Sequence, residues 1–208
     1  MTGLPGAAIL VVIGYLIGAL PFGLLIGRLA GGVDLREHGS GRTGATNALR
    51  TVGLAGAVAT FLLDLGKGVA AVLVARWLYQ AGPSGSPDWV AAAVGVAAIA
   101  GHIRSIFIGL RGGRGAATFT GAMLVTAPWT VAIVVPLVAL VVWRSRIVSL
   151  GSLAGSLLAP VITAAFVPSG QATWAGVALG VGGAALVTAA HGDNIARLRA
   201  GTERRIGR

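Results

Sequence analysis

The segment LPGAAILVVIGYLIGALPFGLLIGRL, residues 4–29, decides the fold class, because it stays apolar for longer than a bilayer is thick. A helix needs about 20 apolar residues to cross the hydrocarbon core. Five further apolar runs follow, at residues 53–75, 89–108, 116–142, 147–167 and 173–190. Only 11% of the 208 residues are charged, whereas soluble domains carry about 25%. The sequence therefore predicts an all-α, polytopic transmembrane helical bundle, built as a single integral membrane domain over residues 1–208.

The first run is not expected to be a cleaved signal peptide. No Lys or Arg precedes it, and it exceeds the roughly 7–15 apolar residues of a signal core. The chain has no cysteine, which excludes disulfides and thiolate chemistry. Histidine occurs only at positions 38, 102 and 191, so we expect no dedicated metal site.

The placement of positive charge predicts the orientation in the membrane. The net charge of +10 is carried by short loops at residues 30–50 and 103–115 and by the tail after residue 190. The loops at 80–88 and 167–171 contain no Lys or Arg. Basic loops stay in the cytoplasm, which predicts an N-terminus outside and a C-terminus in the cytoplasm. The positive charge is thus explained by the orientation of the protein in the membrane, and we expect no nucleic-acid partner.

This orientation requires an odd number of crossings, although six apolar runs are present. The run 116–142 contains Pro128 and Pro136 and is followed by Arg144 and Arg146. Two helices hinged near Pro128 would return these arginines to the cytoplasm and give seven crossings. Helices of about 13 residues cover only ~20 Å of a ~30 Å core, so they require a thinner bilayer or an earlier start. Six crossings with an exposed arginine pair is the alternative.

Glycines four residues apart recur within the apolar runs. Such spacing allows helix backbones to approach closely in lipid. We therefore expect close helix packing at these pairs: Gly14 and Gly18, Gly23 and Gly27, Gly151 and Gly155, Gly176 and Gly180.

The first polar motif is GSGRTGATNALR, residues 39–50, between the first two runs. Its glycines free backbone N–H groups, and its arginines supply fixed charge, which together suit the binding of a phosphate. The alternative is a flexible loop whose arginines only set topology. The residues expected to contact phosphate here are Gly39, Ser40, Gly41, Thr46, Asn47 and Arg50.

The second motif, LRGGRGAATFTG at residues 110–121, places glycines and arginines before the expected start of a helix. The nucleotide-binding pattern G-x-x-x-x-G-K-[ST] is absent, so nucleotide hydrolysis is not indicated. The residues expected to bind phosphate are Arg111, Gly112, Gly113, Arg114 and Gly115.

The third motif, HGDNIARLRAGTERRIG at residues 191–207, follows the last apolar run. His191 and Asn194 are three residues apart and would share a helix face with Arg197. The alternative is a cationic amphipathic helix lying on anionic lipid.

Asp64 and Lys67 lie in the middle of an apolar run. Ionisable groups in such segments indicate function by default, but the spacing of three residues also lets these two neutralise one another. Two interpretations stay open: a structural ion pair, with Asp64 as a structural residue, and a substrate contact through Lys67. His102 is expected to be a structural hydrogen-bonding group.

The three motifs together predict a cytoplasm-facing pocket for a phosphate-bearing molecule. A transporter for a phosphorylated solute is the alternative, but it would place its site at the membrane midplane between repeats. A lipid-binding membrane subunit is a second rival, which leaves the glycine-rich loops unexplained.

The motifs resemble those of the bacterial membrane-bound glycerol-3-phosphate acyltransferases that use acyl phosphate as donor, the PlsY family. GSGRTGATNALR is similar to GSGNxGATNxxR, RGGRGAAT to RGGKGxAT, and HGDNIARLRAGTE to HxxNIxRLxxGxE. DLGKG and GHIRSIF also fit the family pattern. The His-x-x-x-x-Asp motif of other glycerol-phosphate acyltransferases is absent. Departures from the pattern are Arg42 for asparagine and Arg114 for lysine.

The resemblance implies transfer of a fatty acyl group from acyl phosphate to the 1-hydroxyl of sn-glycerol 3-phosphate. The products would be lysophosphatidic acid and inorganic phosphate, the first acylation in phospholipid biosynthesis. It implies no cofactor and a site facing the cytoplasm in the bacterial inner membrane. Membrane lipid surrounds such a protein, and a soluble acyl-phosphate-producing enzyme is a further candidate partner.

Roles also follow from the resemblance. Ser40 and Arg50 match the essential serine and arginine, His191 and Asn194 a catalytically important pair, and Glu203 an acid required for structure. Residues 112–115 match the loop that binds glycerol phosphate. His191 is a candidate base for the acceptor hydroxyl, and a phosphate oxygen of a substrate is the alternative.

Overall fold

The computed structural model describes residues 1–79 and 86–207, and the regular structure in this part is entirely helical, as predicted. Residues 80–85 of the predicted arginine-free loop, and Arg208 of the tail, lie outside the described residues. The helices are α1 (Gly3–Ala19), α2 (Phe22–Gly31), η1 (Leu35–Glu37), α3 (Ala45–Leu78), α4 (Pro87–Ile103), η2 (Ile106–Ile108), α5 (Ala116–Thr126), α6 (Pro128–Ser145), α7 (Val148–Ala165), α8 (Trp174–Ala190) and α9 (Gly192–Arg199).

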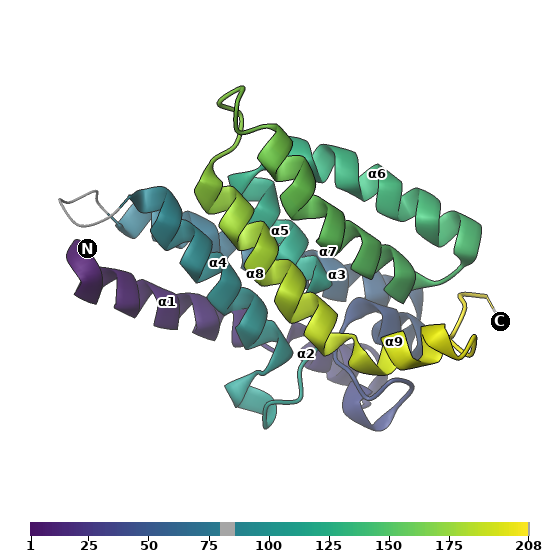
Figure 1. Ribbon diagram of the computed structural model, residues 1–208. Helices are drawn as coiled ribbons and strands as arrows, with labels where there is room; N and C mark the ends of the chain where they lie inside the picture. The colour runs from purple at the N-terminus through teal and green to yellow at the C-terminus, as the bar shows by residue number, and fades with distance from the viewer. Residues whose placement is uncertain (80–85, 208) are drawn as a thin grey trace.

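The long helices form one bundle. Figure 1 shows α6 and α7 side by side on one flank, α1 and α4 on the other, and α8 between them. α3 packs against both α4 and α5 in the interior. The core is therefore made where α4, α5 and α8 meet, with buried Ile99, Phe119 and Leu179.

Glycines bring the helix backbones together, as their spacing predicts. A Cβ at Gly18 would lie 2.0 Å from the carbonyl oxygen of Ala98, so α1 touches the backbone of α4. Cβ atoms at Gly151 and Gly155 would lie 2.6 Å and 2.4 Å from valine methyl groups of α6. Such contacts exclude larger side chains and replace the hydrophobic driving force that helices lack in lipid.

Three breaks interrupt the predicted runs. The first run divides into α1 and α2 at Pro21, which has no N–H to donate and so ends the preceding helix. The hinge predicted near Pro128 is present at Ala127, between α5 and α6. The third break lies at the start of the second apolar run, where Gly53 kinks α3 with φ +80° and ψ −172°. Helix α3 extends beyond that run and begins at Ala45.

The two ends of the bundle differ. At one end the Met1 amine donates to the Leu78 carbonyl (2.8 Å), and Arg76 donates to the Val125 carbonyl (3.0 Å). At the other end Ile206 N donates to the carbonyl of Arg146 (2.8 Å), so the arginine pair after α6 lies beside the C-terminal tail. This is the arrangement expected of two helices hinged near Pro128.

By length and composition, five helices of the described part can cross a membrane. A sixth is added if α8 and α9, which meet at a bend of 65°, count as one span. α5 has only 11 residues, or about 17 Å of helix, so it is shorter than the hydrocarbon core. The prediction of seven crossings and the predicted orientation stay predictions.

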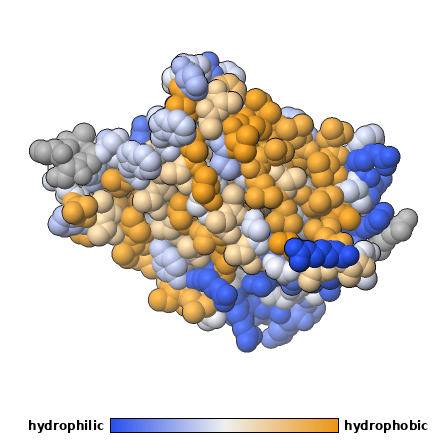
Figure 2. Space-filling view, in the orientation of Figure 1, coloured by the Kyte–Doolittle hydropathy of each residue, from blue (hydrophilic) through white to orange (hydrophobic). Residues whose placement is uncertain are grey.

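Apolar side chains cover the outside of the bundle. Figure 2 shows hydrophobic residues across the helix faces and hydrophilic residues gathered at the end that holds α9 and the tail. Helix α6 is the clearest example, with 71% of Trp143 and 56% of Trp129 exposed. An apolar surface of this size is suited to lipid.

Candidate active site

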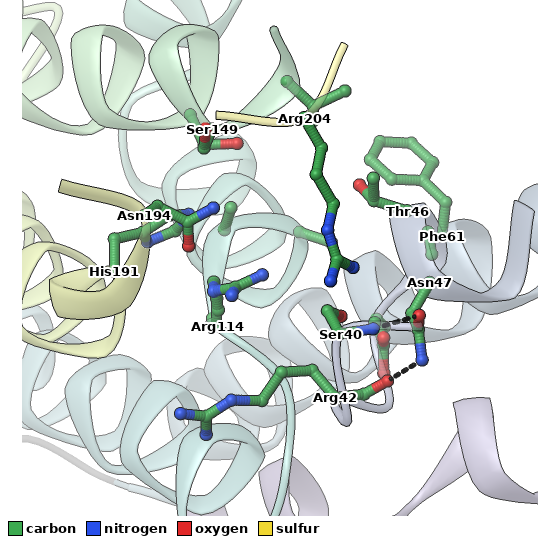
Figure 3. A pocket seen from close by; sticks show the side chains of 18 of the residues that line it. Ser40, Arg42, Thr46, Asn47, Phe61, Arg114, Ser149, His191, Asn194 and Arg204 are labelled. Carbon is green, nitrogen blue, oxygen red and sulfur yellow. Dashed lines mark hydrogen bonds between the residues drawn. The ribbon is translucent and has the colours of Figure 1, made fainter. Parts of the chain in front are cut away.

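A pocket at the hydrophilic end brings residues of all three motifs together. Figure 3 shows side chains from the loop before α3, from α3, from the loop before α5, from α7 and from α9 directed toward one space. The expected site residues among those lining it are Ser40, Thr46, Asn47, Arg50, Asp64, Arg114, Gly115, His191, Asn194 and Glu203. Residues up to 164 positions apart in the chain thus meet in one pocket, since the lining includes both Ser40 and Arg204.

Asn47 holds the first motif in shape. Its Oδ1 accepts a hydrogen bond from the Ser40 N–H (2.9 Å), and its Nδ2 donates to the carbonyls of Leu35 and Arg42 (2.7 and 2.8 Å). Gly39 has φ +58°, and a Cβ there would lie 2.2 Å from Asn47 Oδ1. The side-chain amide of Asn47 is thus used within the loop, and its role in this structure is to fix Ser40 at the pocket edge.

The second half of this motif is helical, contrary to the expectation of a flexible loop. Residues 45–50 form the first turns of α3, so Thr46 and Arg50 are presented from a helix. Gly44 precedes the helix in an extended conformation, which leaves the first N–H groups of α3 unpaired by helical carbonyls. A helix start beside a pocket favours the binding of an anion.

The second motif contributes less than expected. The N–H groups of Gly112 and Gly113 donate to the carbonyls of Ile103 and His102 (3.2 and 3.1 Å), so they are not free for phosphate. A Cβ at Gly112 would lie 1.9 Å from the His102 carbonyl oxygen. The two glycines therefore let the loop pack on α4, while Arg114 and Gly115 line the pocket. Arg111 lies outside it.

Arg114 supplies positive charge inside the pocket. One guanidinium nitrogen lies 2.6 Å from Asp193 Oδ2. Its Nε is buried and has no hydrogen-bond partner among the described residues. Burial lowers the pKa of Arg114, and Asp193 opposes this shift. A bound anion would supply the partner that Nε lacks, which is the requirement of a phosphate site.

His191 lies at the bend between α8 and α9. Its Nδ1 is 2.7 Å from the carbonyl oxygen of Val187, which can only accept, so Nδ1 carries the proton. Nε2 is then the ring nitrogen that can meet a ligand. Burial lowers the pKa of His191, and the nearby Arg114 adds to this, so the ring is neutral at pH 7. The imidazole is thus prepared to accept a hydrogen bond.

Asn194 and Glu203 form a buried network at the pocket wall. Glu203 Oε1 accepts from Asn194 Nδ2 (2.6 Å) and Ser149 Oγ (3.0 Å), and Oε2 accepts from Arg197 Nε (2.7 Å). Burial alone would raise the pKa of Glu203, but these hydrogen bonds hold it below its ordinary value. Asn194 Oδ1 is buried without a partner among the described residues, so it can accept from a substrate hydroxyl.

Asp64 and His102 line the pocket, and Lys67 contacts Asp64 from outside the described lining. Lys67 Nζ is 2.9 Å from Asp64 Oδ1 and donates to the carbonyl of Leu20 (2.9 Å). His102 Nδ1 lies 3.4 Å from the same carboxylate. Lys67 is absent from the described lining, so the structure favours the ion-pair interpretation over a substrate contact.

Several lining residues had not been expected as site residues from the sequence, among them Ser149, Phe61, Arg204 and Arg42. Ser149 lies in an apolar run and Phe61 in another, where nothing marks them as facing a pocket. Arg204 follows Glu203 in the tail, and Figure 3 shows its guanidinium reaching into the pocket. Arg42 had been counted only as loop charge, although its departure from the asparagine of the motif is a signal that could have singled it out.

These features define a class: a polytopic helical membrane protein with an arginine-rich pocket at its hydrophilic end, lined by residues of all three motifs. A profile of the glycerol-3-phosphate acyltransferase family matches residues 8–201. The chain therefore belongs to this family, the PlsY family of integral membrane proteins, and is an acyltransferase. The resemblance recognised in the three motifs is confirmed.

The similarity extends over the whole chain. A glycerol-3-phosphate acyltransferase of Synechococcus sp. (strain CC9902) is 44% identical over 200 residues, covering 96% of this chain and 94% of the relative. One of Geobacter sulfurreducens is 43% identical over 198 residues, covering 95% and 96%. The crystal structure of PlsY (YgiH) in its glycerol 3-phosphate form superposes with a TM-score of 0.84 at 32% identity, covering 97% of this chain and 96% of that one.

Proposed function

We propose that this acyltransferase moves a fatty acyl group from acyl phosphate to the 1-hydroxyl of sn-glycerol 3-phosphate. The products are lysophosphatidic acid and inorganic phosphate, and the reaction is the first acylation in phospholipid biosynthesis. The observation that carries this proposal is the meeting of Ser40, Arg114 and His191, one residue from each motif, in a single pocket.

Both substrates carry a phosphate group, and the pocket holds matching charge. Arg42, Arg50, Arg114 and Arg204 all line it. Arg204 belongs to the C-terminal tail and Arg50 to the first turns of α3, so the two arginines reach the pocket from different elements. Arginine binds phosphate with paired N–H groups, and four of them can neutralise two phosphates held close together.

The chemistry requires no covalent enzyme intermediate, because acyl phosphate is a mixed anhydride and already activated. The C1 oxygen of glycerol phosphate attacks the acyl carbonyl carbon and forms a new C–O bond. The bond from that carbon to the phosphate oxygen then breaks, and the electron pair leaves with phosphate. The arginines and the Ser40 hydroxyl are suited to stabilise the tetrahedral oxyanion and the departing anion.

The hydroxyl proton has two possible acceptors. Nε2 of His191 can accept a hydrogen bond from the hydroxyl, because Nδ1 is committed to Val187. The departing phosphate is the second acceptor, and it holds the proton once the products form at neutral pH. In either case His191 and Oδ1 of Asn194 orient the nucleophile.

We place the enzyme in the bacterial inner membrane with the pocket facing the cytoplasm. The arginines that line the pocket belong to the loops that the positive-inside rule assigns to the cytoplasm. Glycerol 3-phosphate reaches such a pocket from water, while the acyl chain of the donor stays in lipid. No cofactor takes part, and a soluble enzyme that makes acyl phosphate is a candidate donor of substrate.

The test uses purified protein in detergent or lipid, with palmitoyl phosphate and glycerol 3-phosphate and without CoA or carrier protein. Phosphate release that depends on glycerol 3-phosphate, and that is lost in Ser40→Ala and Arg50→Ala, is the expected result. Arg199→Ala is the matched control, since Arg199 is exposed and lies outside the described lining. If well-folded protein released no phosphate in this assay, the proposal would be wrong.

A further inference from the structure

A second hollow lies beside the catalytic pocket and is lined mainly by arginines. We call it the arginine hollow; its residues are Arg36, Gly41, Arg42, Arg104, Leu110 and Arg111. Arg42 lines both this hollow and the catalytic pocket. Figure 3 shows the Arg42 side chain extending away from Ser40, past Arg114. Of the two arginines of the second motif that were expected to bind phosphate, Arg114 lines the catalytic pocket and Arg111 lines the arginine hollow.

The walls of the hollow are fixed by hydrogen bonds. Arg36 is held by Asp34 (2.6 Å), and its Nη1 donates to the carbonyl of Ile108 (3.3 Å), which joins the loop around η1 to the loop around η2. The Tyr15 hydroxyl donates to the carbonyl of Arg104 (2.6 Å), at the end of α4. These bonds fix the side chain of Arg36 and the backbone that carries Arg104.

The loop that carries Arg111 has an unusual backbone. Leu110 has φ +62°, one of two non-glycine residues with positive φ in the described part. Its N–H donates to the carbonyl of Ser105 (2.8 Å), which closes the loop. A left-handed conformation costs a side-chain-bearing residue about 1–2 kcal/mol, and strain of this kind clusters at binding sites.

The charge of the hollow is not balanced by the protein. Arg36 has Asp34 as its partner, but Arg42, Arg104 and Arg111 have no acidic group within 4.0 Å among the described residues. Three positive charges that face one hollow repel each other unless an anion lies between them. A phosphate group carries the charge and the oxygen atoms that guanidinium groups bind best.

We propose that the arginine hollow is a second phosphate-binding site, separate from the catalytic pocket and joined to it through Arg42. Two sources have the required chemistry: a free phosphate or phosphomonoester from water, and the phosphate of an anionic lipid headgroup.

Binding of inorganic phosphate to the intact protein in maltoside micelles, followed by 31P NMR, tests the free source. We expect phosphate to bind in two places on the wild-type chain, the hollow and the catalytic pocket. Arg104→Gln should weaken binding in the hollow about tenfold or more, since a charge-assisted hydrogen bond is worth about 1.5–3 kcal/mol. Arg50→Gln should weaken binding in the pocket, and Arg199→Gln neither. Two sites that respond separately would support a free phosphate as the occupant.

Native mass spectrometry from nanodiscs that contain phosphatidylglycerol tests the lipid source. A retained lipid that is lost in Arg104→Gln and kept in Arg199→Gln would assign the hollow to a headgroup. The proposal is overturned if neither phosphate binding nor lipid retention changes in Arg104→Gln while the variant keeps its wild-type melting temperature. These readouts measure binding alone, so failure of the proposed acyl transfer would not affect them.

Discussion

The Nδ1 atom of His191 lies 2.7 Å from the carbonyl oxygen of Val187, one helical turn earlier. This contact fixes the proton on Nδ1 and leaves Nε2 for the pocket. The backbone of α8 thus does what a carboxylate does in many enzymes: it selects the tautomer of the imidazole. The bend after Ala190 makes this possible, because it places the ring at the helix end.

The pH dependence of kcat/KM reports this environment. Burial lowers the pKa of His191 below its ordinary 6.5. The neutral imidazole therefore predominates at pH 6.5, and enzyme activity falls only at lower pH, where the ring becomes protonated. We expect an acid limb below pH 6.5 in the wild type. Glycerol phosphate also titrates, with a second pKa of about 6 for a phosphomonoester. Its contribution to the acid limb of the kcat/KM profile must therefore be distinguished from that of His191.

His191→Gln provides that separation, since glutamine keeps a hydrogen-bonding group without titrating. The limb that remains in His191→Gln belongs to the substrate, and the limb that vanishes belongs to His191. A kcat reduced by about 100-fold or more fits proton transfer to Nε2. Retention of kcat with only a raised KM in His191→Ala would rule out His191 as the base and assign the proton to phosphate.

Glu203 should control both stability and activity. Glu203→Ala leaves Asn194 and Arg197 without their shared acceptor, and an unsatisfied buried group costs about 1–3 kcal/mol. We expect a lower melting temperature and a large loss of activity. Ser149→Ala is the graded control, because it removes only one of the three hydrogen bonds to the carboxylate.

The Glu203 network also predicts a dependence on pH. The pKa of Glu203 is lower in the folded protein than its ordinary 4.5, so its contribution to stability is present above pH 4.5. That contribution is lost as the pH falls through the lower, folded value. Melting temperatures measured from pH 7 to pH 3 should fall more steeply for the wild type than for Glu203→Gln. Parallel curves would contradict the role of the carboxylate.

Gly112→Ala should disrupt the second motif. The new Cβ would lie 1.9 Å from the carbonyl oxygen of His102, a backbone atom that cannot turn aside. Overpacking of this kind costs about 1–3 kcal/mol or more. Gly66→Ala is the control, because nothing lies within 4 Å of its Cβ position. Equal melting temperatures for the two variants would show that the loop does not pack on α4 as described.

Arg204→Ala should raise the KM of a phosphate substrate about tenfold, since a charge-assisted hydrogen bond is worth about 1.5–3 kcal/mol and this residue is exposed. Its neighbour Arg205 carries the same charge but does not line the pocket in the described residues. Arg205→Ala should therefore leave KM within about twofold, which distinguishes direct contact from general attraction. Steady-state kinetics in 150 mM salt, where distant charges are screened, measure the difference.

The sequence predicted the helical class, because long apolar runs are local signals, and its three motifs singled out about half of the residues that line the pocket. It also predicted the hinge near Pro128, since proline ends helices by its own chemistry. The start of α3 at Ala45 was missed, because a segment rich in glycine, serine, threonine and arginine is typical of a loop. The hydrogen bonds of Asn47, which hold this segment in place, become visible only in the structure.

Other features depend on contacts between distant segments. The amides of Gly112 and Gly113 bond to the end of α4, which no spacing within their own motif reveals. The partner of the His191 ring is a backbone carbonyl, which every residue possesses and no sequence pattern marks. Ser149 meets Glu203 only because α7 packs beside the tail. Contacts of this kind depend on the three-dimensional packing of the helices and cannot be predicted from the local sequence.

The most direct test of the central claim compares donors in the same membranes. Protein in vesicles would receive glycerol 3-phosphate with either palmitoyl phosphate or palmitoyl-CoA, and mass spectrometry would count lysophosphatidic acid against released phosphate. We predict product from palmitoyl phosphate alone, with one phosphate released for each lysophosphatidic acid. Equal product from palmitoyl-CoA, or phosphate release that does not need glycerol 3-phosphate, would contradict the account.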